Sequence, residues 1–154
     1  EVLQYTRFHY DWVVLDVPPI FHRLSLLALS EADRAFLVST GELPSLHLTR
    51  KAVVLLGNLG FTRDRFQVVV NRMNKKEGLQ GSDLSKLFDC PVQASLPNDY
   101  FSLHRVITLG RPLANDCELG RAIDALAGRI AGISATDKKG AGGVLSTKPA
   151  FSES

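Results

Sequence analysis

The sequence has 154 residues, of which 45% are hydrophobic and 22% charged, and its formal net charge is +2. These values are typical of one globular domain with a real core, and the charge gives no argument for nucleic-acid binding. No apolar run approaches the roughly 20 residues of a membrane span, which excludes a transmembrane helix, and no signal peptide is visible. Two distant cysteines, Cys90 and Cys117, lack metal-ligand spacing and favour a reduced cytoplasmic protein.

The first predicted elements are a helical segment within residues 1–9 and a buried strand at residues 12–16. The strand begins with a continuous apolar run rich in β-branched side chains, which is typical of a strand covered on both faces. Pro18 and Pro19 end it because neither can donate a ladder hydrogen bond. Asp16 therefore stands at the carboxyl end of a strand, where open α/β sheets place their ligands. A carboxylate there can orient a magnesium-bound water beside a phosphate, or it can simply cap the loop or helix that follows.

Three further apolar strands alternate with helices along the rest of the chain. The predicted strands are residues 34–39, 66–71 and 92–96, and the predicted helices are residues 24–30, 44–58, 82–88, 100–109 and 119–130. Asp99 is the predicted N-cap of one helix, and Gly60 and Gly110 are predicted left-handed C-caps of two others. This alternation predicts βαβ units with right-handed crossovers. We therefore predict an α/β domain over residues 1–132, with a parallel sheet flanked by helices.

The composition changes after residue 132 to Gly, Ser, Thr, Lys and Ala. Only Val144, Leu145 and Phe151 are large and apolar in this part of the chain. Such a segment cannot bury enough surface to offset its chain entropy. We therefore predict that residues 133–154 form a disordered tail.

Polar residues follow each predicted strand and define a candidate ligand site. They are Asp16, then Ser39 and Thr40, then Asn71 and Arg72, then Pro97, Asn98 and Asp99. The carboxyl ends of parallel strands share one edge of a sheet, so these residues can line one cleft. Asn can read the edge of a nucleobase and Arg can stack on its face. Structural roles also fit, as a turn residue for Asn71 and a helix cap for Asp99, and the sequence has no Gly-rich phosphate loop.

Segments of the chain resemble MinD/ParA-type P-loop ATPases in order and spacing. Residues 10–19 (YDWVVLDVPP) look like the Walker B and switch II region, and residues 68–72 (VVVNR) look like the Asn-Arg motif that contacts the base. Residues 32–40 resemble the helix end and strand that come next. The segments 96–100 and 109–113 resemble the part that closes the domain. The resemblance covers most of the chain.

Two segments point to one branch of this family. Residues 43–46 (LPSL) and 96–100 (LPNDY) most resemble CpaE/TadZ proteins, which help to assemble and position Flp-type pili in bacteria. One departure is local, because family members often carry Gly soon after the prolines, where this chain has Ile20 and Phe21. That difference argues against a conformational switch of this segment in response to the terminal phosphate of ATP.

The resemblance assigns roles to the candidate site residues. It implies that Asp16 holds magnesium through a water, that Asn71 and Arg72 approach the adenine, and that Pro97, Asn98 and Asp99 lie nearby. It also implies the C-terminal part of a longer ATPase domain, whose phosphate loop, first strand and dimer-contacting lysine would precede Glu1. ATP and magnesium are therefore expected as cofactors only with that upstream segment, and this chain alone is not expected to hydrolyse ATP.

The function implied by the resemblance is that of an ATP-binding protein in Flp-type pilus assembly or polar localisation. We expect it in the cytoplasm, with recruitment to the inner face of the membrane by partners. The expected partners are a second copy of the domain and pilus-assembly proteins, without nucleic acid. Direct membrane insertion is not expected, since residues 134–154 lack the amphipathic helix of MinD. Two alternatives stay open: a non-catalytic interaction scaffold, and a ParA-like DNA-partitioning ATPase that uses the basic residues between Arg63 and Lys76.

Overall fold

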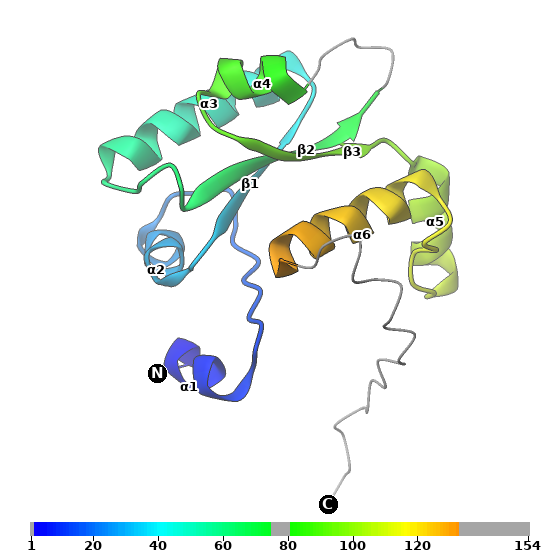
Figure 1. Ribbon diagram of the computed structural model, residues 1–154, viewed down its shortest axis with the longest axis horizontal. Coiled ribbons are helices and arrows are strands. Elements are labelled where there is room, and N and C mark those ends of the chain that lie inside the picture. The colour runs from blue at the N-terminus through cyan, green and yellow to red at the C-terminus, as the bar shows by residue number, and fades with distance from the viewer. Residues whose placement is uncertain (1, 75–80, 133–154) are drawn as a thin grey trace, which may run out of the picture.

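The computed structural model describes residues 2–74 and 81–132, and its centre is a three-stranded parallel sheet (Figure 1). The strands are β1 (Ala35–Thr40), β2 (Phe66–Met73) and β3 (Val92–Pro97), side by side in that order. The helices are α1 (Val2–His9), α2 (Arg23–Glu31), α3 (Leu43–Asn58), α4 (Gly81–Phe88), α5 (Tyr100–Leu109) and α6 (Glu118–Ala131). The predicted α/β fold is confirmed. The predicted tail, residues 133–154, lies outside the described residues.

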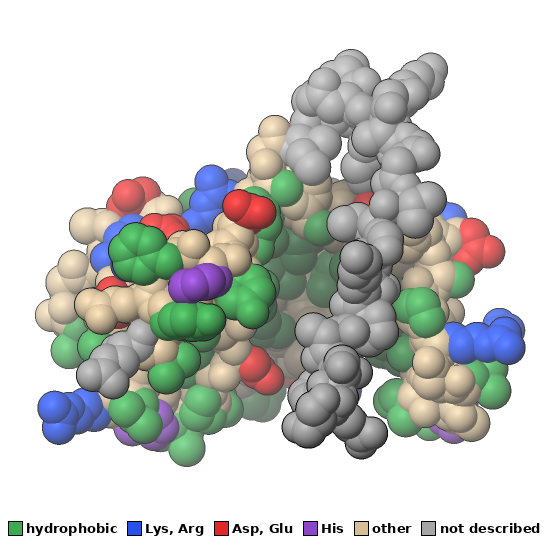
Figure 2. Space-filling view, turned by 90° about the horizontal axis from the view of Figure 1, so that it is seen from below, with side chains coloured by type: hydrophobic (Ala, Val, Ile, Leu, Met, Phe, Trp, Pro, Cys, Tyr) green, Lys and Arg blue, Asp and Glu red, His purple; other side chains and the backbone are tan. Residues whose placement is uncertain are grey.

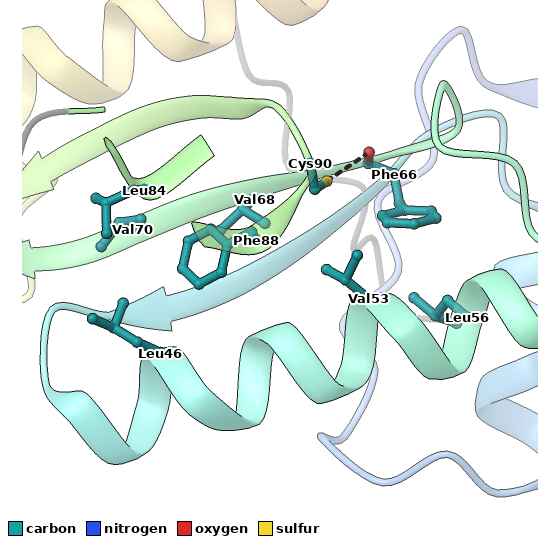
Figure 3. Close-up of a cluster of buried hydrophobic side chains, with 9 residues drawn as sticks. All are labelled: Leu46, Val53, Leu56, Phe66, Val68, Val70, Leu84, Phe88 and Cys90. Carbon is teal, nitrogen blue, oxygen red and sulfur yellow. Dashed lines mark hydrogen bonds between the residues drawn. The ribbon is translucent and has the colours of Figure 1, made fainter. Parts of the chain in front are cut away.

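The main core lies between the sheet and the pair of helices α3 and α4, which cover the same face (Figures 1 and 3). Alternation along β2 turns Phe66, Val68 and Val70 toward these helices. The buried cluster is completed by Leu46, Val53 and Leu56 of α3, Leu84 and Phe88 of α4, and Cys90. The Cys90 thiol donates to the Phe66 carbonyl at 3.6 Å, and burial raises the pKa of this thiol. Cys90 is therefore a protonated core residue at neutral pH.

Helix ends follow the local chemistry that the sequence predicted. Pro44 stands in the first turn of α3, where its missing N–H leaves no bond unmade. The Asp99 carboxylate accepts a hydrogen bond from the Ser102 backbone N–H at 3.1 Å, as an N-cap does. Gly110 ends α5 with a φ of 61°, a conformation that favours glycine. The end of α2 is held differently, because the Arg65 guanidinium donates to the carbonyls of Leu29 and Ser30 in its last turn and to that of Ala32, its C-cap.

The predicted strand at residues 12–16 is not formed, which corrects the sequence-based prediction of four strands. The segment between α1 and α2 is extended but pairs with none of the described strands (Figure 1). Its apolar side chains are exposed, with Trp12 at 62% and Val14 at 91%. A strand needs a neighbour that satisfies its backbone N–H and C=O groups. The described part of the chain places no such neighbour beside residues 12–16, so their apolar pattern alone does not make a strand.

The face of the sheet turned away from α3 is only partly covered. α6 packs over β3 on this side, whereas none of the described helices packs closely over β1 there. Ser39 of β1 contacts α3, so alternation turns the neighbouring Val38 to the opposite face, where it is 68% exposed. Figure 2 shows this side of the molecule, with hydrophobic side chains around a central hollow. Apolar surface is therefore open on the far side of β1.

Candidate functional site

The carboxyl ends of the three strands meet at one edge of the sheet, as the sequence predicted. Asn71 of β2 is the register partner of Thr40 in β1, and Met73 of β2 is the partner of Pro97 in β3. The Asn98 N–H donates to the Met73 carbonyl at 3.1 Å, which ties the turn after β3 to the end of β2. This edge therefore brings together seven of the eight predicted site residues, namely Ser39, Thr40, Asn71, Arg72, Pro97, Asn98 and Asp99.

The end of β2 has an irregular backbone at Asn71 and Arg72. Arg72 has a φ of 55°, a left-handed conformation that costs a non-glycine residue about 1 kcal/mol. Its backbone N–H donates to Oδ1 of Asn71 at 2.9 Å, and the register to β3 shifts between Val70 and Met73. Bulges of this kind often stand beside functional sites. Within residues 2–74 and 81–132, the side-chain N–H groups of Asn71 have no partner, so they are available to a ligand.

Asp99 serves as the cap of α5 and lies in the turn that follows β3. Hydrogen bonds from Ser102, from its side chain first and its backbone second, lower the pKa of Asp99 from the ordinary 3.8. The Ser102 N–H donates to the carboxylate at 3.1 Å. The structural role proposed for Asp99 from the sequence is thus confirmed, and its predicted place near the adenine stays a prediction.

We expect Asp99→Ala to lower the thermal midpoint by a few degrees, whereas Asp99→Asn keeps most of the cap. Folding lowers the pKa of Asp99 below its unfolded value of about 3.9, so the charge stabilises the fold fully above that pH. This contribution is lost as the pH falls through the folded pKa. Thermal melts from neutral to acidic pH check this, because the difference in thermal midpoint between wild type and Asp99→Asn should disappear at acidic pH. A gap that does not change with pH would contradict this assignment.

Asp16, the remaining predicted site residue, does not belong to the strand-end edge. It lies in the unpaired segment between α1 and α2 and is exposed. Among the described residues, no group of three or more His, Cys, Asp or Glu side chains could hold a metal ion. Magnesium is usually bound by one or two carboxylates together with phosphate oxygens and waters, so Asp16 alone does not make a magnesium site. The residues that the structure describes also include no Gly-rich loop that could cradle phosphates.

A buried cluster of hydroxyl groups, which the sequence reasoning missed as a unit, joins the end of β1 to α3. Oγ1 of Thr49 donates to Oγ of Ser39 at 2.8 Å, and the Thr40 N–H donates to Oγ of Ser45 at 3.0 Å. Ser39 is 2% exposed and Thr49 8% exposed, and both are hydrogen-bonded. The cluster therefore fixes the β1 end of the edge. The four-residue spacing of Ser45 and Thr49, which places both on one helix face, was the available signal.

Comparison with known proteins places this geometry among ATPase folds. No family model matches the chain. The septum site-determining protein MinD of Thermotoga maritima is 28% identical over 95 residues, which are 58% of this chain and 35% of that protein.

Solved structures match over most of the chain. A ParA family ATPase from Chlorobium tepidum aligns with a TM-score of 0.73 at 18% identity, over 82% of this chain and 54% of that one. A MinC:MinD cell division protein complex of Aquifex aeolicus gives 0.73 at 23% identity, over 86% and 57%. MinD complexed with Mg-ADP from Pyrococcus horikoshii gives 0.69 at 19% identity, over 88% and 56%.

These similarities establish the fold. The described chain has the MinD/ParA-type ATPase fold, which confirms that part of the resemblance seen in the sequence. The chain spans about a third of the curated relative (35%) and little more than half of these solved structures (54% to 57%). The assignment to the CpaE/TadZ branch stays a prediction.

Proposed function

We propose that this chain supplies the base-binding half of a MinD/ParA-type ATPase site. The observation that carries the proposal is the junction of β2 and β3, where Met73 pairs with Pro97 and places Asn71 and Arg72 beside the turn that contains Asp99. In the finer form of the proposal, the chain is the C-terminal part of a CpaE/TadZ-like protein in Flp-type pilus assembly or polar localisation.

The strand-end residues have the chemistry that a nucleobase requires. The side-chain N–H groups of Asn71, which have no partner among the described residues, can donate to acceptors on the base edge, and the exposed Arg72 guanidinium can stack on the base face. The hydrogen bond from the Ser102 N–H to the Asp99 carboxylate holds the turn after β3 in place. Magnesium, when bound with ATP, would neutralise phosphate charge. Asp16 would hold it through a water only once residues 12–16 pair with a strand of the upstream segment. The phosphate cradle would come from a segment encoded before Glu1.

The partners and location follow from the same proposal. One of the similar structures is a MinC:MinD complex. For this chain we propose a homodimer through the complete ATPase domain and contacts with pilus-assembly proteins. It would act in the cytoplasm, with recruitment to the inner face of the membrane by those partners. In the described part of the chain, no helix is long and apolar enough to cross a bilayer.

A second candidate function is a non-catalytic interaction scaffold, which one contact favours. Phe21 is partly buried and packs against the main core cluster. The segment after Pro18 and Pro19 is thereby anchored at the position where family members often carry Gly. An anchored phenylalanine suits a fixed surface better than a segment that moves with the terminal phosphate.

Nucleotide binding distinguishes the two functions. The chain should be expressed with and without the residues encoded immediately upstream, and binding of a fluorescent ATP analogue measured with magnesium. We expect the longer protein to bind at least about 100-fold more tightly, because backbone N–H groups and a lysine of a phosphate loop are then present. Tight magnesium-dependent binding by residues 1–154 alone would contradict the proposal that the phosphate cradle comes from an upstream segment. If the longer protein binds no nucleotide, the scaffold function is supported.

Site variants test the role of the strand ends. In the longer protein, Asn71→Ala should weaken nucleotide binding about tenfold, which is the effect of losing one or two hydrogen bonds to the base. The matched control is Asn58→Ala, at the exposed end of α3, which should change nothing. Circular dichroism spectra establish that both variants fold. Equal effects from both variants would contradict the base contact.

A further inference from the structure

α5 is a helix whose outward face is apolar. None of its ten residues is buried. Tyr100, Phe101 and Ile107 are exposed by 66%, 82% and 83%. The Tyr100 ring contacts the rings of Phe101 and His104, with centroids 5.9 Å apart in both pairs, and Ile107 follows His104 by three residues on the same side of the helix. These side chains therefore form one exposed patch, and such patches mark sites where a partner binds.

The composition and charge of α5 resemble those at the centre of a protein interface. Such centres are enriched in aromatic residues and Arg, and they are depleted in residues such as Lys, Asp, Glu and Ala. The sequence of α5 contains none of these four residue types. Arg105 of α5 and the nearby Arg111 are exposed, and within residues 2–74 and 81–132 no carboxylate forms an ion pair with either. Both cations are therefore available to acidic groups from outside the chain.

The position of α5 keeps it apart from the unpaired part of the fold. The helix follows β3 and lies at the end of the domain away from α1 and residues 12–16 (Figure 1). A segment that pairs with residues 12–16 would therefore leave the outward face of α5 uncovered. This face also contains none of the predicted strand-end residues, so an inference about it does not rest on nucleotide binding.

We propose that the outward face of α5 binds an acidic amphipathic helix of a partner protein. α5 has 10 residues and is therefore about 15 Å long, enough to pack along nearly three turns of a partner helix. Its aromatic and isoleucine side chains would pack between leucine-like anchors at helical spacing. Glutamates beside those anchors would meet Arg105 and Arg111, and this charge complementarity selects an acidic helix as the occupant.

Other occupants fit the charges and side chains less well. A second copy of α5 would bring no carboxylate and would place like charges together. Attraction to an anionic membrane typically uses four to eight Lys or Arg, whereas residues 100–113 contain two. Single-stranded nucleic acid stacks on open ring faces in a basic groove, but the Tyr100 ring already contacts Phe101 and His104.

A pair of peptides tests the proposal directly. The acidic probe is a capped helical peptide with leucines at positions i, i+3, i+4 and i+7 of each repeat and glutamates on the flanks. The basic probe has lysine in place of every glutamate. With the full chain immobilised at low density in a surface plasmon resonance cell, we expect the acidic probe to bind at least about tenfold more tightly than the basic one.

Charge variants assign this preference to α5. The double variant Arg105→Glu with Arg111→Glu should reverse the preference, so that the basic probe binds more tightly. The matched control is Arg23→Glu with Lys86→Glu, which makes the same change of charge on exposed positions of α2 and α4. This control should keep the preference of the wild type.

Apolar variants test the contact with the leucines of the probe. Phe101→Gln with Ile107→Gln should weaken binding of the acidic probe at least about tenfold. The matched control is Leu24→Gln with Leu27→Gln, at positions of α2 that are exposed by 70% and 52%. This control should bind the acidic probe as the wild type does, and circular dichroism should show that all variants fold.

Other outcomes would overturn the proposal. These are no binding of the acidic probe, equal binding of both probes, or the same loss in a control as in the matching α5 variant. Phosphatidylserine vesicles and an oligothymidine strand are run in parallel. Binding of either one that is tighter than that of the acidic probe, and that is lost in the Arg105 and Arg111 variant, would instead assign the surface to a membrane or to nucleic acid. Nucleotide binding by the longer protein is measured separately and does not affect these outcomes.

Discussion

Replacing Gly120 with alanine is expected to destabilise the chain by about 3 kcal/mol, although the added side chain is a single methyl group. Gly120 is buried in the first turn of α6, and a Cβ there would overlap the carbonyl oxygen of Ala114. It would also lie only 3.1 Å from Cα of Asn115, so backbone would have to move.

The turn before α6 cannot shift easily, which is why this effect should be large. The Cys117 thiol donates to the Ala114 carbonyl at 3.1 Å, and its sulfur accepts from the Gly120 N–H at 3.2 Å. Room for a methyl group would therefore require breaking the cap of α6. That helix covers β3, so the disturbance would reach the sheet.

The control for this substitution is Gly57→Ala in α3. A Cβ at Gly57 would meet nothing within 4 Å, and alanine favours the helix more than glycine does. We expect a stabilisation of about 0.5 kcal/mol. Urea denaturation followed by circular dichroism measures both free energies of unfolding. Similar values for the two variants would contradict the tight contact at Gly120.

Truncation of Phe88 to alanine is expected to cost about 4 kcal/mol of the free energy of unfolding. Phe88 is 1% exposed at the end of α4, and its ring lies among the core side chains of α3 and β2 (Figure 3). Removing the ring loses its transfer free energy and leaves a cavity between sheet and helices. Such a loss is a large part of the stability of a domain of this size.

Phe101 supplies the matched control for Phe88. It is 82% exposed on α5, so Phe101→Ala should change the free energy of unfolding by about 0.5 kcal/mol or less. The same urea titrations compare the two variants. A large loss at Phe101 would show that α5 is covered in solution, and a small loss at Phe88 would contradict the core between the sheet and α4.

Much of the fold could be predicted because its signals are local. The apolar runs near Ala35, Phe66 and Val92 are strands, and Asp99 and Gly110 bound α5 as predicted. Capping residues and left-handed glycines act over a few residues, so no distant contact is needed to read them. The chain order of strands and helices was enough to predict a parallel sheet.

The candidate site could be predicted in part for the same reason. The carboxyl ends of parallel strands lie at the same edge of a sheet. A prediction of a parallel sheet therefore already places Asn71 and Pro97 near each other. The left-handed backbone conformation of Arg72 was not predictable from the residue type, because arginine rarely adopts this conformation. Asp16 was placed on the same edge only by assuming that residues 12–16 form a strand.

The sequence by itself determined where apolar side chains and helix ends occur, and hence the α/β class of the chain. The tertiary structure alone decided which apolar segments are paired or covered. Residues 12–16 and 66–70 have similar patterns, yet only the second has neighbours on both sides in the described sheet. The outward face of α5 and the tight contact at Gly120 are likewise properties of the packed molecule. The physical reason is that hydrophobicity belongs to a residue, whereas a ladder hydrogen bond or a buried surface requires a second segment.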